Sequence, residues 1–262
     1  MAKKTNEIKA KDYKSNVLVD GDMQIRFAVG PEETKQFDTQ KLIDNFLVND
    51  LMVSDQLKLV YTHYDRMIIG GAVPVNKTLV LPNHPELRAD YFLERRELGI
   101  INVGGKGTVT VDGKKYEVEN KSCLYVGKGN KKISFTSASK KAPAVFYLLS
   151  PPANAVYPIT KFTKEQAAPV QLGAAETSNK RTVYKYIHLD GIKSCQLVMG
   201  LTVLESGSVW NSVPPHTHTR RMEVYFYFDV PAEQRIFHFM GNPMETRHIV
   251  MKNNEAVISP PW

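Results

Sequence analysis

The sequence has no long apolar segment. No uncharged apolar run approaches the roughly 18–20 residues that a membrane-spanning helix requires. The first residues, Met1 to Asn6, carry lysines that no apolar stretch follows. Neither a signal peptide nor a membrane anchor is therefore expected. The chain is predicted to be cytoplasmic and to have no membrane partner.

Cysteine is scarce. Cys123 and Cys195 are the only two, and they form no CxxC pair. They provide no disulfide framework, which suits a reducing compartment. Both are predicted to be small, buried, apolar side chains.

Clusters of one charge sign are also missing. The 34 Lys and Arg exceed the 27 Asp and Glu, for a net charge of +7, but the basic residues are scattered along the chain. A nucleic-acid partner is therefore not expected, and the milder inference is a basic surface that attracts small anions. With 42% hydrophobic and 23% charged residues, the composition also excludes a mostly disordered chain.

What the sequence does contain is a β pattern. Short runs of β-branched and aromatic residues are separated by Gly, Pro, Asn and Asp, which is typical of antiparallel sheets. The dipeptide Asp112-Gly113 predicts a hairpin turn between two such runs. One of the few helix signals lies at 38–48, where apolar residues recur at helical spacing after Asp38 or Thr39 as N-cap. An all-β fold with a short N-terminal helix is predicted.

The strands fall into two sets. Pro151-Pro152 ends the first set, a polar segment to about Ala175 follows, and a second set begins at Thr182. We expect two jelly-roll-like β modules, 1–155 and 156–262, with the lysine-rich N-terminal segment of the first loosely held.

One segment carries metal chemistry. His216 and His218 are two residues apart, so on a strand their imidazoles project from one face. Glu223 follows across a short turn expected at 219–221. Two imidazoles and a carboxylate suit a borderline transition metal with open positions for water or substrate. The alternative is that the site binds no metal: both histidines lie at the surface, and Glu223 forms an ion pair with Arg220 or Arg221. The full H-x-H-x4-E spacing between strands favours a metal site.

The sequence also resembles a known family. H-x-H-x4-E is the first metal motif of the cupin superfamily. Longer segments of the sequence resemble the 5-keto-4-deoxyuronate isomerase family within that superfamily. The similarity runs from about residue 37 to the last residue. The segments are Tyr61 to Arg66, Phe92 to Gly99, Tyr125 to Gly129, Arg221 to Phe228 and Glu245 to Met251.

The resemblance implies a fold, an activity and a cofactor. The expected protein has two cupin barrels, one Zn2+ per subunit in the C-terminal barrel and a homohexameric assembly. It would convert 5-dehydro-4-deoxy-D-glucuronate to 3-deoxy-D-glycero-2,5-hexodiulosonate in pectin and uronate breakdown. His216, His218 and Glu223 match three of the family's zinc ligands. The fourth is a histidine of a Pro-x-Trp-Ser-Ile-His segment, whereas this sequence ends at Trp262, so truncation of the second barrel is expected.

The chemistry requires further groups. A ketol-isomerase needs a general base. The sequence offers Glu94, Glu97, Tyr225, Lys185 or a metal-bound water and does not distinguish among them. An anionic sugar-acid substrate calls for a cationic clamp, with Arg220, Arg221 and Arg247, and also Arg181, as candidates, although surface charges or structural ion pairs explain them equally well.

Two other functions stay open. One is an iron-dependent cupin oxygenase with the same ligands, and the other is a sugar-acid-binding cupin without catalysis. The first module lacks an HxH motif and is expected to be metal-free. The glycines of Gly104-Gly105-Lys106-Gly107 precede a strand rather than a helix, which argues against a phosphate loop.

Overall fold

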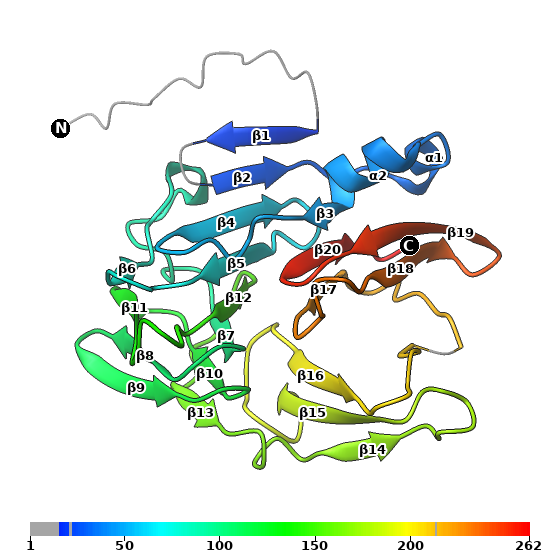
Figure 1. Cartoon of the computed structure of the whole chain (residues 1–262). Helices are drawn as coiled ribbons and strands as arrows, with labels where there is room; N and C mark the ends of the chain where they lie inside the picture. The colour runs from blue at the N-terminus through cyan, green and yellow to red at the C-terminus, as the bar shows by residue number, and fades with distance from the viewer. Residues whose placement is uncertain (1–15, 21–22, 213) are drawn as a thin grey trace, which may run out of the picture.

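The computed structural model describes residues 16–20, 23–212 and 214–262 and is mostly β (Figure 1). The predicted loosely held residues 1–15 lie outside this part. The described helices are short: α1 (Pro31–Thr34), α2 (Thr39–Phe46) and the 3-10 helix η1 (Pro85–Leu87). Among them, none has the length and apolar character needed to cross a membrane.

The N-terminal half is a sandwich of two sheets. An eight-stranded sheet has the order β1-β2-β4-β5-β12-β7-β10-β13, and a four-stranded sheet has the order β6-β11-β8-β9. The large sheet comprises β1 (Val17–Asp20), β2 (Met23–Arg26), β4 (Leu57–Thr62), β5 (Ile68–Ala72), β7 (Leu98–Asn102), β10 (Cys123–Val126), β12 (Phe146–Ser150) and β13 (Thr160–Phe162). The small sheet comprises β6 (Leu79–Val80), β8 (Gly107–Val111), β9 (Lys114–Val118) and β11 (Ile133–Ser137).

The predicted hairpin is confirmed. Strands β8 and β9 pair antiparallel with Val111 opposite Lys114. The two residues between them have positive φ angles, 48° at Asp112 and 86° at Gly113. This conformation is what a tight two-residue hairpin turn requires, and Asp-Gly adopts it at low cost.

The C-terminal half contains three smaller sheets, with the orders β14-β15-β16, β17-β20-β3 and β18-β19. Figure 1 shows the first of these below β17 and β18. The strands are β3 (Leu47–Val48), β14 (Val170–Leu172), β15 (Arg181–Ile187), β16 (Met199–Leu204), β17 (Glu223–Tyr227), β18 (Ile236–Asn242), β19 (Glu245–Met251) and β20 (Glu255–Ser259). Strand β3 pairs with β20, and β13 pairs with β10, so both halves exchange a strand across residue 155.

The central strands of the large sheet are buried on both faces. Strands β5, β7 and β12 are buried at every position. Ile100 belongs to the core between the two N-terminal sheets, whereas its neighbour Ile101 belongs to a second core shared with the C-terminal half. Tyr147 from β12 stacks on Phe226 from β17 with ring centroids 4.5 Å apart. Because both faces are covered, these strands are continuous apolar runs without polar alternation.

Helix α2 has the sequence features of an amphipathic helix. The Asp38 carboxylate accepts a hydrogen bond from the Lys41 amide at 2.8 Å, which satisfies a donor of the first turn. Leu42 and Phe46 are buried in the second core, while Gln40 and Asp44 face solvent. Phe46 also meets Trp262 edge-on at 6.1 Å. The helix therefore covers the part of the core where the last strand ends.

The two cysteines differ in environment. Cys123 is fully buried, as predicted. The prediction is wrong for Cys195, which is only partly buried and whose Sγ lies 2.7 Å from the Asn154 Oδ1. Cys195 lies in a loop rather than a strand, so neighbouring strands do not cover its thiol.

Candidate metal centre

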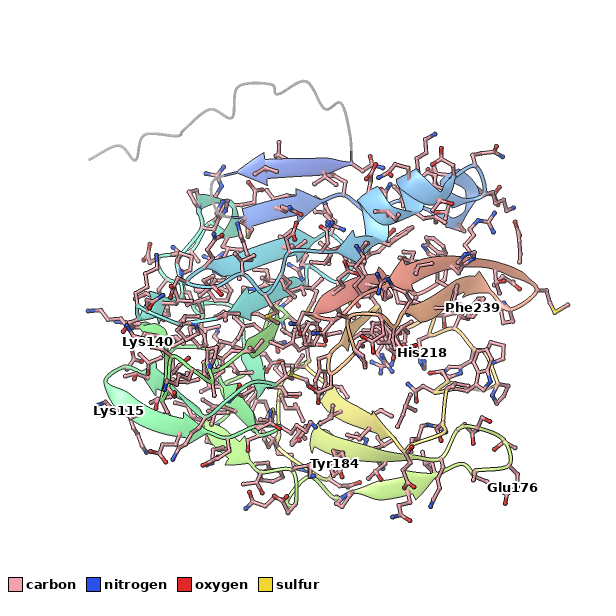
Figure 2. The ribbon with its side chains drawn as sticks, viewed as in Figure 1. Lys115, Lys140, Glu176, Tyr184, His218 and Phe239 are labelled. Carbon is pink, nitrogen blue, oxygen red and sulfur yellow. The ribbon has the colours of Figure 1, made fainter. Side chains whose placement is uncertain are left out.

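The H-x-H segment is a loop that leads into β17. His216 and His218 are not on a strand, contrary to the expectation, and Glu223 is the first residue of β17. A turn at Thr219 and Arg220 reverses the chain between them. The two imidazole rings still meet edge-on, with centroids 4.9 Å apart. Figure 2 shows His218 on the side of β17 and β18 that faces β15 and β16.

His218 and Glu223 are placed as two ligands of one ion would be. The His218 Nε2 lies 3.4 Å from the Glu223 Oε1. Ligand atoms at the usual zinc bond lengths in a tetrahedron are separated by about 3.3–3.5 Å. His216 is exposed, and its Nδ1 lies 3.1 Å from the Pro214 carbonyl oxygen. Within the described residues no three His, Cys, Asp or Glu side chains surround one point. The residue types of the motif suit zinc, but of the three only His218 and Glu223 lie at the distance expected for two ligands of one ion.

The Glu223 carboxylate is fixed on both oxygens. Arg221 donates to its Oε1 and the Tyr225 hydroxyl donates to its Oε2, each at 2.7 Å. Partial burial opposes ionisation, but the hydrogen bonds from Tyr225 and Arg221 outweigh it and lower the pKa of Glu223. Glu223 is therefore ionised at neutral pH, which is the form that ligates a metal.

A partly buried polar pair, Tyr227 and His238, lies behind this carboxylate. Glu223, Tyr225 and Tyr227 share one face of β17, because strand side chains alternate. The Tyr227 hydroxyl lies 2.8 Å from the His238 Nδ1 on β18, and the Tyr225 ring centroid is 5.2 Å from the His238 ring. Burial lowers the pKa of His238 to about 4, so this imidazole is neutral. Its Nε2 is buried without a hydrogen-bond partner among the described residues.

Sequence reasoning gave His238 no role because it belongs to no motif. A weaker signal was present: His238 shares the inner face of β18 with Ile236 and Met240, while Phe237 and Phe239 point outward and are exposed. A histidine on the buried face of an otherwise apolar strand requires a polar partner inside the fold.

Of the side chains considered as the general base, Tyr225 lies beside the motif. Glu94 accepts a hydrogen bond from the Asp90 amide at 2.6 Å, and Lys185 is exposed on β15. Glu97 is fully buried, and its carboxylate accepts four hydrogen bonds. The donors are the Tyr125 hydroxyl and the amides of Cys195, Gln196 and Leu197, at 2.6 to 2.7 Å. Glu97 therefore joins the N-terminal sandwich to the loop before β16.

The three arginines predicted to bind substrate have different surroundings. Arg221 holds Glu223, and Arg220 is exposed in the adjacent turn. Arg247 instead donates to the Lys35 carbonyl at 3.2 Å and pairs with Glu245 at 3.3 Å. It does not join the group around Glu223.

Comparison with known proteins adds sequence and structural relatives. The KduI/IolB family profile matches residues 46–262. A protein named 4-deoxy-L-threo-5-hexosulose-uronate ketol-isomerase from Shouchella clausii is 52% identical over 240 residues, or 92% of this chain and 87% of that protein. A protein of the same name from Formosa agariphila is 54% identical over 237 residues, covering 90% and 85%. The crystal structure of an IolB-like protein from Salmonella typhimurium LT2 has the same fold, with a TM-score of 0.64 at 13% identity over 82% of this chain and 84% of that one.

Proposed function

This chain belongs to the KduI/IolB family, and from that premise we propose that it is a 4-deoxy-L-threo-5-hexosulose-uronate ketol-isomerase. The reaction would convert 5-dehydro-4-deoxy-D-glucuronate to 3-deoxy-D-glycero-2,5-hexodiulosonate. The observation that carries the proposal is the extended identity to proteins of that name, which includes nearly the whole chain. The arrangement of His218 and Glu223 supports it with a site for a Lewis acid.

We assign one zinc ion per subunit to His216, His218 and Glu223. When bound, zinc polarises a substrate carbonyl and stabilises negative charge that develops on its oxygen. Hydrogen bonds from Arg221 and Tyr225 fix the orientation of the Glu223 carboxylate. Zinc binding would therefore cost less side-chain entropy. Burial raises the pKa of Tyr225, so its hydroxyl stays protonated and donates to Glu223.

Other residues would bind the sugar acid. Arg220 is exposed within the turn between His218 and Glu223, so its guanidinium is available to the substrate carboxylate. The neutral pair of Tyr227 and His238 adds polar groups behind Tyr225 without adding charge. The positive charge of Arg220 is exposed to solvent, where it would attract an anion.

The wider setting is also proposed from the family resemblance. Two cupin barrels would divide near residue 155, the first without a metal. Six subunits would assemble into a homohexamer, and the protein would act in the cytoplasm in pectin and uronate breakdown.

An isotope experiment tests the reaction. The full chain, loaded with zinc, is incubated with the 5-ketouronate in D2O, and the product is followed by NMR. We expect a ketol shift with solvent deuterium at the carbon that receives the proton, because the carbonyl migrates through an enediol. Activity and zinc should disappear together in His216→Ala and remain in the control His188→Ala. Turnover that consumes dioxygen, or substrate binding without turnover, would contradict the proposal.

A further inference from the structure

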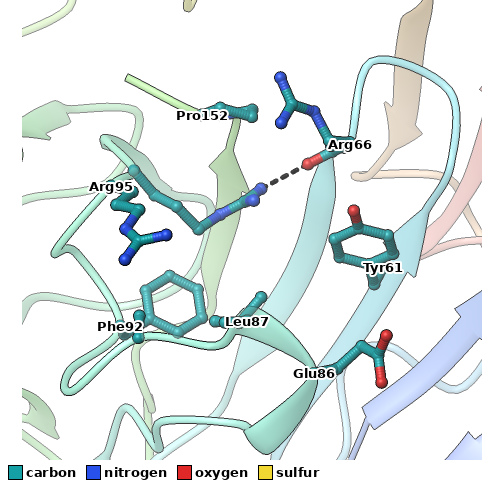
Figure 3. Close-up of a pocket in the computed structure, with 9 residues that line it drawn as sticks. Tyr61, Arg66, Glu86, Leu87, Phe92, Arg95 and Pro152 are labelled. Carbon is teal, nitrogen blue, oxygen red and sulfur yellow. Dashed lines mark hydrogen bonds between the residues drawn. The ribbon is translucent and has the colours of Figure 1, made fainter. Parts of the chain in front are cut away.

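A second polar site lies in the N-terminal sandwich, and none of its lining residues belongs to the metal segment, residues 216–223. It is a cavity of about 240 Å³, smaller than the roughly 300–1,000 Å³ typical of drug-sized ligands. Figure 3 shows Arg66 and Arg95 on different sides of it, with Phe92 and Leu87 along its wall. Two of the sequence segments that carry the family resemblance, at 61–66 and 92–99, meet here.

The cavity has an excess of positive charge. Three arginines line it, Arg66, Arg95 and Arg96, against one carboxylate, Glu86. Among the described residues, none of these three guanidinium groups forms an ion pair. The acidic neighbours in sequence are engaged elsewhere: Glu94 accepts from a backbone amide, and Glu97 holds four donors on the opposite face of the sheet.

Arg96 is the buried member of the cluster, with 6% of its surface exposed. Its guanidinium donates to the Ser150 hydroxyl at 3.2 Å, to the Ser150 carbonyl, and to the Arg66 carbonyl at 2.6 Å, the contact drawn as a dashed line in Figure 3. Neutral acceptors therefore orient Arg96 but do not compensate its charge. Burial lowers its pKa to about 10, so it remains charged at neutral pH.

A buried cation without a counter-ion is costly, and a bound anion relieves that cost. Tyr61 adds a hydrogen-bond donor, since burial raises the pKa of its hydroxyl and keeps it protonated. The apolar side chains of Leu87, Phe92 and Pro152 exclude part of the water, which strengthens charge-assisted hydrogen bonds inside. Arg66 and Arg95 line the cavity and are exposed to solvent.

We propose that this cavity is a binding site for a small oxyanion, the carboxylate or phosphate group of a sugar-sized metabolite. Arg96 forms the fixed base of the site, and Arg66 and Arg95 supply charged donors at its rim. The site is separate from the H-x-H segment and does not depend on the proposed isomerase activity. The turn that carries Asp65 and Arg66 connects it to that segment, because the Asp65 carboxylate accepts a hydrogen bond from the Met222 amide.

Calorimetric titration of the full chain tests this site. The probes are inorganic phosphate, glucose 6-phosphate and D-glucuronate, with glucose as the neutral control. We expect saturable binding of at least one anion, one per chain, and none of glucose. Arg66→Asn and Arg95→Gln should each weaken it about tenfold or more, since each removes a charged donor. Asn suits position 66, whose φ is 51°. Tighter binding of the phosphates or of the uronate identifies the source of the oxyanion.

Two controls separate this site from others. Lys115→Ala removes one exposed charge from β9 outside the cavity and should leave the affinity within about twofold. His216→Ala should also leave it unchanged, because the metal segment is not involved. Absence of anion binding at millimolar concentration, or binding that is lost in His216→Ala but kept in both arginine variants, overturns the proposal.

Discussion

The Asp65 carboxylate accepts a hydrogen bond from the Met222 backbone amide at 2.8 Å, across 157 positions of sequence. Asp65 lies in the turn between β4 and β5, and Met222 is a buried residue directly before Glu223. The contact fixes the point where the metal segment enters β17. The same turn presents the Arg66 carbonyl to Arg96, so one short connection contacts both polar sites.

Removal of this contact should loosen the metal segment. For Asp65→Ala we expect a loss of about 1–3 kcal/mol in the free energy of unfolding, since the Met222 amide loses its acceptor. Zinc affinity should fall as well. Asp65→Asn is the matched control, because Asn keeps an acceptor oxygen and tolerates the φ of 49° at this position. Urea unfolding and zinc titration measure both effects; equal losses in the two variants would argue against the hydrogen bond as the cause.

Glu223→Gln should remove most of the zinc while the fold is kept. The amide oxygen is a weaker ligand than the carboxylate, and the amide nitrogen cannot ligate the ion. Tyr225→Phe removes one hydrogen bond to Glu223 and should reduce zinc affinity by about 10–100-fold, as outer partners of metal ligands do. Elemental mass spectrometry and competition with a chelator measure both. Full zinc occupancy in Glu223→Gln would show that this carboxylate is not a ligand.

Glu97 should matter for stability and not for chemistry. Glu97→Leu leaves the amides of Cys195, Gln196 and Leu197 without their acceptor. The Leu197 bond is buried and the other two are part-buried. An unsatisfied buried amide costs about 1–3 kcal/mol, so we expect the free energy of unfolding to fall by at least about 2 kcal/mol. Glu94→Gln, which retains an acceptor at a partly exposed site, should lose under about 1 kcal/mol. Denaturant unfolding of the two variants measures these losses. Similar stability in both would show that Glu97 does not stabilise the loop before β16.

His238 should make stability dependent on pH. Its pKa falls from the ordinary 6.5 to about 4 in the folded chain. The unfolded chain therefore binds more protons between these values, and stability is full above pH 6.5 and declines as pH falls toward 4. The difference corresponds to about 3 kcal/mol.

The comparison that isolates this effect is His238→Gln, which should flatten the decline, against His188→Gln at a more exposed position, which should not. Unfolding free energies at pH 7 and pH 4.5 measure it. An unchanged decline in His238→Gln would assign the effect to other groups.

Several features were predictable because they are local. Asp112-Gly113 specified its hairpin through the φ angles that these residues tolerate. Asp38 and the apolar spacing after it specified α2. The H-x-H-x4-E spacing identified His218 and Glu223, which lie 3.4 Å apart, whereas His216 contacts the His218 ring and both histidines lie in a loop rather than on a strand.

Other features were not predictable because they depend on which distant segments pack together. The local sequence around Glu97 does not indicate its hydrogen-bond partners, because 98 to 100 residues separate it from its three amide donors. Arg247 matched the chemistry of a substrate clamp, but the strand pairing turns it toward Lys35. His238 belonged to no motif and became a buried partner of Tyr227 only through the fold.

The sequence by itself determined the mostly β fold, the Asp-Gly hairpin turn and the family, because backbone preferences and sequence motifs are properties of neighbouring residues. Only the tertiary structure decided which charges stay uncompensated. Arg66 and Arg96 are 30 residues apart and meet Arg95 around one cavity. Burial and hydrogen-bond partners arise when remote strands pack, and no local pattern contains that information.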